Sequence, residues 1–231
     1  MVQPALDRNA NIDSHALCTL LEAVVRIDTS EGVTSHRRQY SIPEFCKHAV
    51  DEQVQKWITD GVVEVAPHNT GWNTSILVVK KKDLDSNYTD YRVCADLRHI
   101  NTLIIKPDAH PLPLIKDIFH MLKDSELYTS LDLRACFHKL PVYPDHKMKT
   151  SFKVDGFPQL MFHGCPFGLQ QASSIAQRIL SVITNIMSNK AKGKVLHFVD
   201  DLVIFTRNDL QEHAEVVLLR TCYSSAQERQ R

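Results

Sequence analysis

Two hydrophobic periods alternate along the chain, and together they predict an α+β fold. Apolar residues recur every three or four positions over 46–57 and over 172–187, which is the spacing of one buried helix face. Ser41 followed by Glu44 has the form of a capping box for the first helix, and Gly61 is placed to end it. The residues expected on the buried faces are Cys46, Val50, Val54 and Trp57 in the first helix and Ala172, Ile175, Ala176, Ile179, Ile183, Ile186 and Met187 in the second.

Short runs of β-branched and aromatic residues predict strands between these helices. Further helices are expected within 106–124 and from a cap at Asn208 to about Leu219. The pattern favours an antiparallel sheet with helices packed to one side. The expected strands are 75–80 and 91–95, paired as a hairpin; 126–134, in the core; 148–154 and 159–165, as a second pair; and 194–206, as a hairpin.

Composition narrows the class only moderately. The 231 residues are 43% hydrophobic and 23% charged with zero formal net charge, so a nucleic-acid partner would have to be held by a local basic surface. Six scattered cysteines argue against a zinc site and against a disulfide scaffold. With no signal peptide and no run of about 18 apolar residues, the sequence predicts an intracellular protein that is not secreted and has no membrane partner.

Three aspartates interrupt the apolar, strand-like runs. Asp200 and Asp201 lie side by side within 194–206, and Asp132 lies within 126–134. An unpaired carboxylate in an apolar setting costs roughly several kcal/mol, and a bound divalent cation commonly compensates clustered carboxylates. Oxygen-only ligands favour Mg²⁺, and two such ions would serve phosphoryl transfer. A solvated turn without metal is the alternative that these residues alone leave open.

Several longer stretches follow one another over about residues 36–215. They are RRQYSIPEFCKHAVDEQVQKWITDGVVEVAPHNTGWNTS, SILVVKKKD with DYRVCADLRHINTLIIKPDAHPLPLI, LYTSLDLRACFHKLPV, FHGCPFGLQQASSIAQ and FVDDLVIFT. In this order they resemble the reverse transcriptase of gypsy-type LTR retrotransposon polyproteins. FVDDLVIFT is similar to the YxDD hairpin of that family, with Phe198 in place of tyrosine. The PFGLxxAPxxFQ segment of the family has Ser173 here in place of Pro and Ala176 in place of Phe.

The resemblance implies the right-hand polymerase fold, represented by fingers and palm with the thumb absent. Residues 36–219 would form this domain, with the fingers at about 41–110 and 145–170 and the palm in the rest. Residues 1–35 are expected to be a leader or linker, and 220–231 a frayed or truncated tail. RNase H, integrase and protease domains are expected only in a full-length element.

The resemblance also assigns the metal site. Asp132 and Asp200 would be direct metal ligands, with the Leu133 carbonyl as an additional ligand and Asp201 as a neighbouring, less direct carboxylate. The implied cofactor is a pair of Mg²⁺ ions, for which Mn²⁺ is a possible substitute.

Nucleotide and template contacts follow from the same resemblance. Phe137 takes the position of the aromatic residue that excludes a 2′-hydroxyl, with simple core packing as its alternative role. Lys81 and Arg92 match the fingers residues that hold the triphosphate, with solvated strand-end charges as the alternative. The remaining implied contacts are Phe167 and Gly168 with the nucleotide, and Gln170, Phe198 and Val199 with the template or primer.

The function expected from the resemblance is RNA-directed DNA polymerisation, in which dNTPs are added to a primer on an RNA or DNA template. One alternative is an inactive, nucleic-acid-binding remnant of that domain, and another is an unrelated Mg²⁺-dependent phosphohydrolase. Localisation in cytoplasmic virus-like particles is implied by the resemblance alone.

Overall fold

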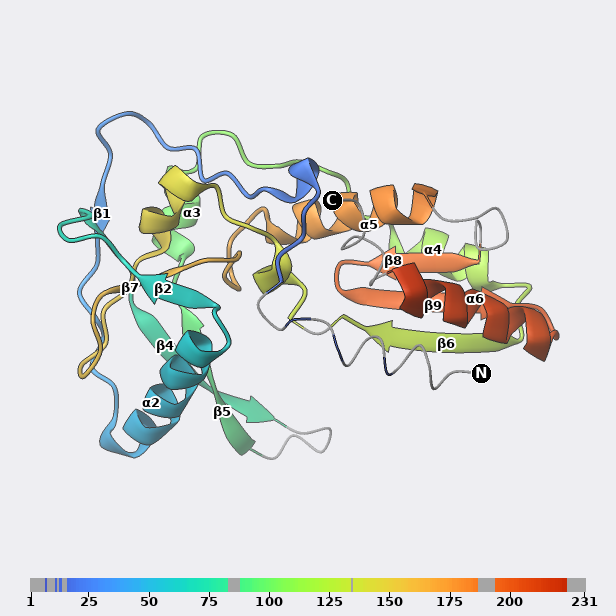
Figure 1. The fold of residues 1–231 in the computed structure, drawn as a ribbon, viewed down its shortest axis with the longest axis horizontal. Helices are drawn as coiled ribbons and strands as arrows, with labels where there is room; N and C mark the ends of the chain where they lie inside the picture. Colours follow the sequence, from blue (N-terminus) through green and yellow to red (C-terminus); the bar gives the residue numbers. More distant parts are fainter. Residues whose placement is uncertain are drawn as a thin grey trace. The chain divides into compact units, whose positions relative to one another are not determined.

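The computed structural model describes residues 16–82, 88–133, 135–186 and 194–223, together with Asp7, Asn11 and Asp13. The chain divides into two compact units, and it crosses between them four times. Unit 1 contains the described parts of 1–23, 109–136 and 173–231, and unit 2 contains those of 24–108 and 137–172. Figure 1 shows the elements of both units. No helix in the described ranges is long and apolar enough to cross a membrane.

Unit 1 is built on a three-stranded antiparallel sheet with the strand order β6-β9-β8 (Figure 1). Its strands are β6 (Leu127–Asp132), β8 (Val195–Phe198) and β9 (Asp201–Thr206). Strands β8 and β9 form the hairpin predicted within 194–206. The aspartate pair of the sequence therefore lies at the connection between two strands. Strand β6 forms where a core strand was predicted, but it is an outer strand of this sheet and its residues alternate between half-buried and exposed, so its predicted place in the core is wrong.

Helices α5 (Ala172–Ile186) and α6 (Leu210–Tyr223) cover one face of this sheet. The face of β6 that carries Tyr128, Ser130 and Asp132 is exposed, as the alternation of side chains along a strand requires. The predicted packing of helices on one side of the sheet is therefore confirmed for this unit. One buried cluster joins both helices to the sheet: Leu180 of α5, Val216 of α6, Val195 of β8, and Leu202 and Ile204 of β9.

The last helix begins one residue later than predicted. Asp209, not Asn208, is its cap, because the Asp209 Oδ1 atom accepts hydrogen bonds from the backbone N–H groups of Gln211 (2.9 Å) and Glu212 (3.0 Å). Helix α6 then continues to Tyr223, beyond the predicted end near Leu219. The rest of the predicted tail, 224–231, lies outside the described residues.

Unit 2 contains the first predicted helix, α2 (Glu44–Thr59). Its buried residues are the four predicted ones, Cys46, Val50, Val54 and Trp57. The capping-box prediction is wrong, because the N-cap is Pro43 and no side chain caps the helix. Gly61 follows the helix with a φ of 62°, a left-handed conformation that glycine adopts without a Cβ penalty, as expected for a residue that ends a helix.

Strands β4 (Ile76–Lys82) and β5 (Tyr88–Ala95) form the predicted hairpin. The second predicted pair is different in the structure. Residues 148–150 belong to a 3₁₀ helix that begins at Pro144, and Phe152 makes only a single bridge to Leu160. Strand β7 (Leu160–Phe162) pairs instead with β2 (Val63–Val65). Proline is favoured in a first helical turn, which accounts for the helical start.

Helix α4 (Ile115–Leu122) forms where a helix was expected, but none of its residues is buried. Several other short elements were not predicted. The unpredicted elements are α3 (Arg98–Leu103), strand β2 (Val63–Val65), strands β1 (Ser35–His36) and β3 (Trp72–Asn73), which pair in parallel, and the 3₁₀ helices η1 (Leu21–Ala23), η2 (Phe137–Lys139) and η3 (Pro144–Thr150).

Part of the expected leader or linker packs into unit 2. Val25 and Ile27 have no exposed surface. The Val25 N–H donates to the Pro141 carbonyl (2.8 Å), and the Tyr143 N–H donates to the Val25 carbonyl (2.9 Å). These are contacts of irregular backbone, so they leave no period in the sequence from which they could have been predicted.

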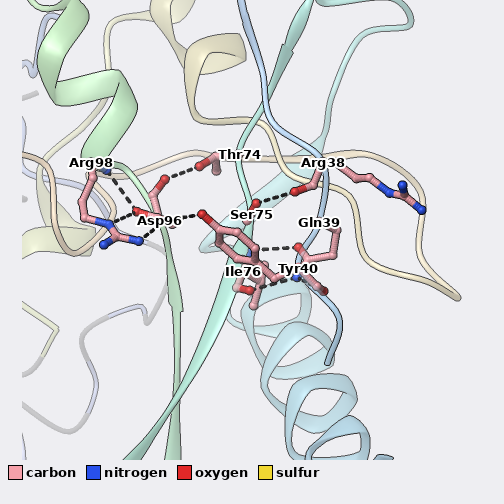
Figure 2. Close-up of polar contacts among 8 residues, drawn as sticks. All are labelled: Arg38, Gln39, Tyr40, Thr74, Ser75, Ile76, Asp96 and Arg98. Atoms are coloured by element: carbon pink, nitrogen blue, oxygen red, sulfur yellow. Dashed lines mark hydrogen bonds and ion pairs between the residues drawn. The ribbon is translucent and has the colours of Figure 1, made fainter. Parts of the chain in front are cut away.

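Residues 38–40 are likewise held by hydrogen bonds to distant parts of the chain, and they lie beside the start of strand β4 (Figure 2). The Gln39 side-chain amide accepts from the Ile76 N–H (2.7 Å) and donates to the Ile76 carbonyl (2.9 Å), as a neighbouring strand would. At the end of β5, the Asp96 carboxylate accepts from both Arg98 Nε and Nη2 at 2.8 Å and from the Tyr40 hydroxyl at 3.2 Å. Arg98 thereby lowers the pKa of the Asp96 carboxyl.

Candidate active site

The fold brings the three predicted catalytic aspartates to one end of the sheet in unit 1. Asp132 is the last residue of β6 and lies directly opposite Asp201, the first residue of β9. Asp200 occupies the turn between β8 and β9, and its carbonyl accepts the Leu133 N–H at 3.2 Å. Asp132 and Asp201 are exposed and Asp200 is half-buried. The backbone pairing of β6 with β9 brings these like charges together.

The donor atoms at this end of the sheet suit a hard divalent cation. Within the described residues, no group of three or more His, Cys, Asp or Glu side chains is arranged to hold a metal ion by itself. Mg²⁺ is commonly held by one or two carboxylates, with phosphate oxygens and waters supplying the rest. Asp132, Asp200 and the Leu133 carbonyl offer only oxygen atoms, so they fit Mg²⁺ if a substrate completes the coordination.

The pKa of the Cys136 thiol reflects the negative charge at this end of unit 1. Burial is the largest cause that raises the pKa of this thiol to about 11, and the charge of Asp200, a contribution from Cys18 and the charge of Asp132 add to the effect of burial in reaching that value. The Cys136 thiol is therefore held protonated. The backbone N–H of Cys136 donates to the Leu133 carbonyl at 3.2 Å. That carbonyl has a second lone pair, which is compatible with the predicted role of Leu133.

The turn that carries Asp200 has an unusual backbone. Val199 has a φ of 61°, a left-handed conformation that costs a β-branched residue about 1–2 kcal/mol. Its N–H donates to the side-chain Oε1 of Gln177 on α5 at 3.0 Å, and Gln177 Nε2 donates to the His197 carbonyl at 3.2 Å. No role was predicted for Gln177. In the sequence it stands at the final glutamine of the segment that resembles PFGLxxAPxxFQ, directly after Ala176.

Four of the other predicted site residues gather in unit 2. The rings of Phe137 and Phe167 pack edge to face with centroids 5.3 Å apart. Gly168, with a φ of 90°, follows Phe167. The unpredicted Asn101 fixes this turn, because its Nδ2 donates to the Gly168 carbonyl (2.8 Å) and its Oδ1 accepts the Gln170 N–H (2.9 Å). Phe137, Phe167, Gly168 and Gln170 therefore form one structural group.

The two predicted triphosphate-binding residues lie on the hairpin of unit 2. Arg92 on β5 is exposed and lies opposite Val79 of β4. Lys81 on β4 pairs with Asp90 at 3.1 Å, in a contact whose two side chains remain largely in solvent. A hydrogen bond from the Tyr91 N–H and then Lys81 lower the pKa of Asp90. An exposed pair of this kind is worth little, so Lys81 can exchange Asp90 for another anion at small cost.

His138 supports the aromatic group and was also missed in the sequence. Its ring stacks on Phe162 with centroids 6.1 Å apart. It also packs edge to face with Phe167, with centroids 4.8 Å apart. Its Nδ1 atom lies 3.1 Å from the Cys165 carbonyl, to which the neutral ring donates. Burial lowers the pKa of His138 to about 4. The ring is therefore neutral at physiological pH.

The pKa of His138 predicts a loss of stability in acid. Between about pH 6.5 and pH 4 the folded chain binds fewer protons at this residue than the unfolded chain does. The stability contributed by neutral His138 is therefore present above pH 6.5 and is lost as the pH falls through 4, by about 3 kcal/mol in total. Urea unfolding of the parent and of His138→Phe at several pH values should show a smaller loss in the variant.

Carboxylates also titrate in this range, so the comparison needs a matched control. His68 is exposed, and its replacement by Phe leaves the buried aromatic group intact. The His68→Phe variant should follow the parent across the pH range. An equal loss of stability in the parent and in His138→Phe would contradict the assignment.

The chain is similar in sequence to retroelement polyproteins. A family described as "Reverse transcriptase (RNA-dependent DNA polymerase)" matches residues 79–228. The Retrovirus-related Pol polyprotein from transposon gypsy of Drosophila melanogaster is 32% identical over 204 residues, which are 87% of this chain and 19% of that protein. The Pol polyprotein from transposon opus of the same organism is 29% identical over 82% of this chain and 18% of its own length. The chain thus spans about a fifth of these relatives.

Solved structures show the same fold. The prototype foamy virus protease–reverse transcriptase has a TM-score of 0.67 at 20% identity, covering 89% of this chain and 25% of that one. The foamy viral protease–reverse transcriptase dRH in complex with double-stranded DNA has a TM-score of 0.75 at 18% identity, covering 95% of this chain and 37% of that one. The predicted α+β fold of fingers and palm is confirmed by these likenesses.

Proposed function

The chain belongs to the reverse transcriptase (RNA-dependent DNA polymerase) family, and we propose on that premise that it adds dNTPs to a primer 3′-hydroxyl on an RNA or DNA template. The observation that carries the proposal is the register of β6, β9 and the β8–β9 turn, which collects Asp132, Asp200 and Asp201 at one end of a sheet. Three carboxylates at one place repel one another, and a nucleotide–metal complex is the ligand that such a site is suited to bind.

Within this site, Asp132 and Asp200 would hold two Mg²⁺ ions, with the Leu133 carbonyl as a further ligand. When bound, the ions supply positive charge that favours deprotonation of the 3′-hydroxyl and departure of pyrophosphate. Asp201 adds negative charge beside them, and its pairing with Asp132 keeps the two strand ends in register. The backbone bond from Leu133 to Asp200 ties the turn to β6, so the carboxylates are placed before substrate arrives.

The group in unit 2 would select and hold the nucleotide. Phe137 presents a ring that leaves no room for a 2′-hydroxyl, and its edge-to-face contact with Phe167 limits the ring's movement. Gly168 lets the backbone approach the nucleotide closely because it has no Cβ. Lys81 and Arg92 are exposed cations that would neutralise the triphosphate. Template and primer would contact Gln170, Phe198 and Val199.

Binding of nucleic acid without synthesis is the second candidate. It is favoured by two departures from the PFGLxxAPxxFQ segment of the family, Ser173 in place of Pro and Ala176 in place of Phe. Ala176 is buried on α5, so the smaller side chain supplies less volume to the core of unit 1. Primer–template affinity that is retained in the absence of any extension would identify this case.

Primer extension tests the proposal. The chain is incubated with a labelled primer on an RNA template, dNTPs and Mg²⁺, beside Asp200→Asn and the surface control Asp51→Asn. We expect extension by the parent and by Asp51→Asn, and none by Asp200→Asn, because a neutral amide is a poorer Mg²⁺ ligand. Duplex binding without extension by any of the three favours the second candidate. Template-independent hydrolysis of simple phosphate esters would overturn both in favour of a phosphohydrolase.

A further inference from the structure

Gln177 is a buried amide whose two ends are both engaged. It lies on α5 with 4% of its surface exposed. A buried amide is costly unless its donor and acceptor find partners, and here both partners belong to the β8–β9 hairpin. Oε1 accepts the Val199 N–H at 3.0 Å, and Nε2 donates to the His197 carbonyl at 3.2 Å. The Gln177 side chain therefore hydrogen-bonds to the backbone of the residue before Phe198 and of the residue after it.

Helix α5, which carries Gln177, is itself held in place by packing and by a second side chain. Its neighbours Ala176 and Leu180 are buried, so α5 cannot rotate without opening the core of unit 1. Ser181 lies one helical turn further on, and its hydroxyl donates to the Gln177 carbonyl at 2.9 Å and lies 3.1 Å from His197 Nε2. Helix and hairpin are thus joined by side chains of two successive turns of α5.

One of the two hydrogen bonds of Gln177 is made to Val199, the residue whose backbone is strained. Val199 would leave its left-handed conformation for a lower-energy one if its N–H had no partner. Asp200 follows directly, and its own carbonyl is held by the Leu133 N–H at 3.2 Å. The backbone that sets the direction of the Asp200 carboxylate therefore lies between two anchors, Gln177 on one side and β6 on the other.

We propose that Gln177 is a positioning residue that holds Val199 in its left-handed conformation and so directs the Asp200 carboxylate. The catalytic consequence rests on the proposed function, whereas the conformational one does not. Gln177 touches neither substrate nor metal in this assignment. Its effect is transmitted through two backbone groups.

Amide hydrogen exchange, measured by NMR without metal or nucleotide, tests the conformational part. Gln177→Met keeps the length of the side chain and removes both hydrogen bonds. Exchange of the Val199 amide should become at least tenfold faster, while the Ile204 amide, which belongs to the β8–β9 pairing, should be unchanged. The matched control is Gln39→Met, because Gln39 makes the same two kinds of bond to Ile76 in unit 2. It should leave Val199 unaffected.

A second variant guards against a failure of Gln177→Met to fold. Gln177→Glu keeps an oxygen that can accept the Val199 N–H but loses the donor to the His197 carbonyl. Val199 exchange should therefore stay within threefold of the parent in this variant. Fast Val199 exchange in Gln177→Glu, or unchanged exchange in a folded Gln177→Met, would overturn the proposal.

Kinetics of primer extension test the catalytic consequence in a chain that shows activity. Gln177→Met should lower kcat at least tenfold and leave the KM for dNTP within twofold, since the residues proposed to contact the sugar and the triphosphate belong to unit 2. Adding Val199→Gly should restore part of kcat, at least threefold, because glycine adopts positive φ without a Cβ penalty. A raised KM at constant kcat, or a further loss in the double variant, would refute positioning. An inactive parent refutes the proposed function, and the exchange data still decide the role of Gln177.

Discussion

Asp132→Asn should abolish primer extension while making the folded chain slightly more stable. Asp132 faces Asp201 directly across the β6–β9 pair, and both residues are exposed. Like charges opposite one another in a sheet are unfavourable, so a neutral amide at 132 should raise the free energy of unfolding by about 0.5 kcal/mol. The same change removes a carboxylate proposed as a direct metal ligand. We expect the extension rate to fall about a thousandfold, or about 4 kcal/mol of transition-state stabilisation.

The comparison with Asp201→Asn separates the two effects. That variant removes the same repulsion, so its gain in stability should equal that of Asp132→Asn within a few tenths of a kcal/mol. Its loss of extension should be clearly smaller, because Asp201 is assigned the less direct position. Urea unfolding and single-turnover extension of both variants provide the measurement. Equal losses of activity would show that the two aspartates share one role, and a loss of stability in either would contradict the repulsion.

Gly164→Ala should be the most destabilising single-methyl change in unit 2. A Cβ at this buried residue would lie 1.9 Å from the His138 carbonyl oxygen and 2.7 Å from its carbonyl carbon. Both are backbone atoms, so the segment that follows β7 and the segment around His138 would have to separate. We expect a loss of about 3 kcal/mol or more, measured by urea unfolding. For a chain of this size that corresponds to a fall in Tm of about 6–12 °C.

Gly156→Ala is the matched control for this prediction. A Cβ at Gly156 would meet no atom within 4 Å, although its φ of 84° disfavours any side chain. That variant should lose only about 1 kcal/mol, the cost of the left-handed backbone. The difference between the two variants isolates the steric clash at His138. If Gly164→Ala were no less stable than Gly156→Ala, the close approach of the two backbones would be refuted.

The features predicted correctly are those that local pattern encodes. The buried face of α2 follows from apolar spacing alone, and the aspartate hairpin follows from two β-branched runs around a charged pair. That Asp132 lies at the same end of the sheet as Asp200 required a second strand far away in the sequence, which the apolar run around Asp132 indicated; the pairing of Asp132 with Asp201 was not predicted. Helix and hairpin signals of this kind act within a few residues, so they survive in any tertiary context.

The features that were missed depend on contacts between distant segments. The pairing of Val63–Val65 with Leu160–Phe162 joins strands too short to carry a period. Gln177 and Asn101 bind backbone groups on other elements, and a glutamine or asparagine gives no local sign of such a partner. The cap at Asn208 was misplaced because the adjacent Asp209 has a similar capping propensity. The capping box at Ser41 was wrong because the helix begins only after Pro43, where no side chain caps it.

The crossing of the chain between the two units governs how it can fold during synthesis. Strand β6 emerges from the ribosome about 70 residues before β9, the central strand that hydrogen-bonds to it. Until β9 appears, the backbone groups of β6 have no partner, and the segment from Phe137 to Ala172 must instead complete unit 2. Pairing over so long a loop is slow and exposes a strand edge. Production of this protein should therefore depend on chaperones that shield β6 until β9 is synthesised, and neither unit can be obtained as a single contiguous piece of the gene.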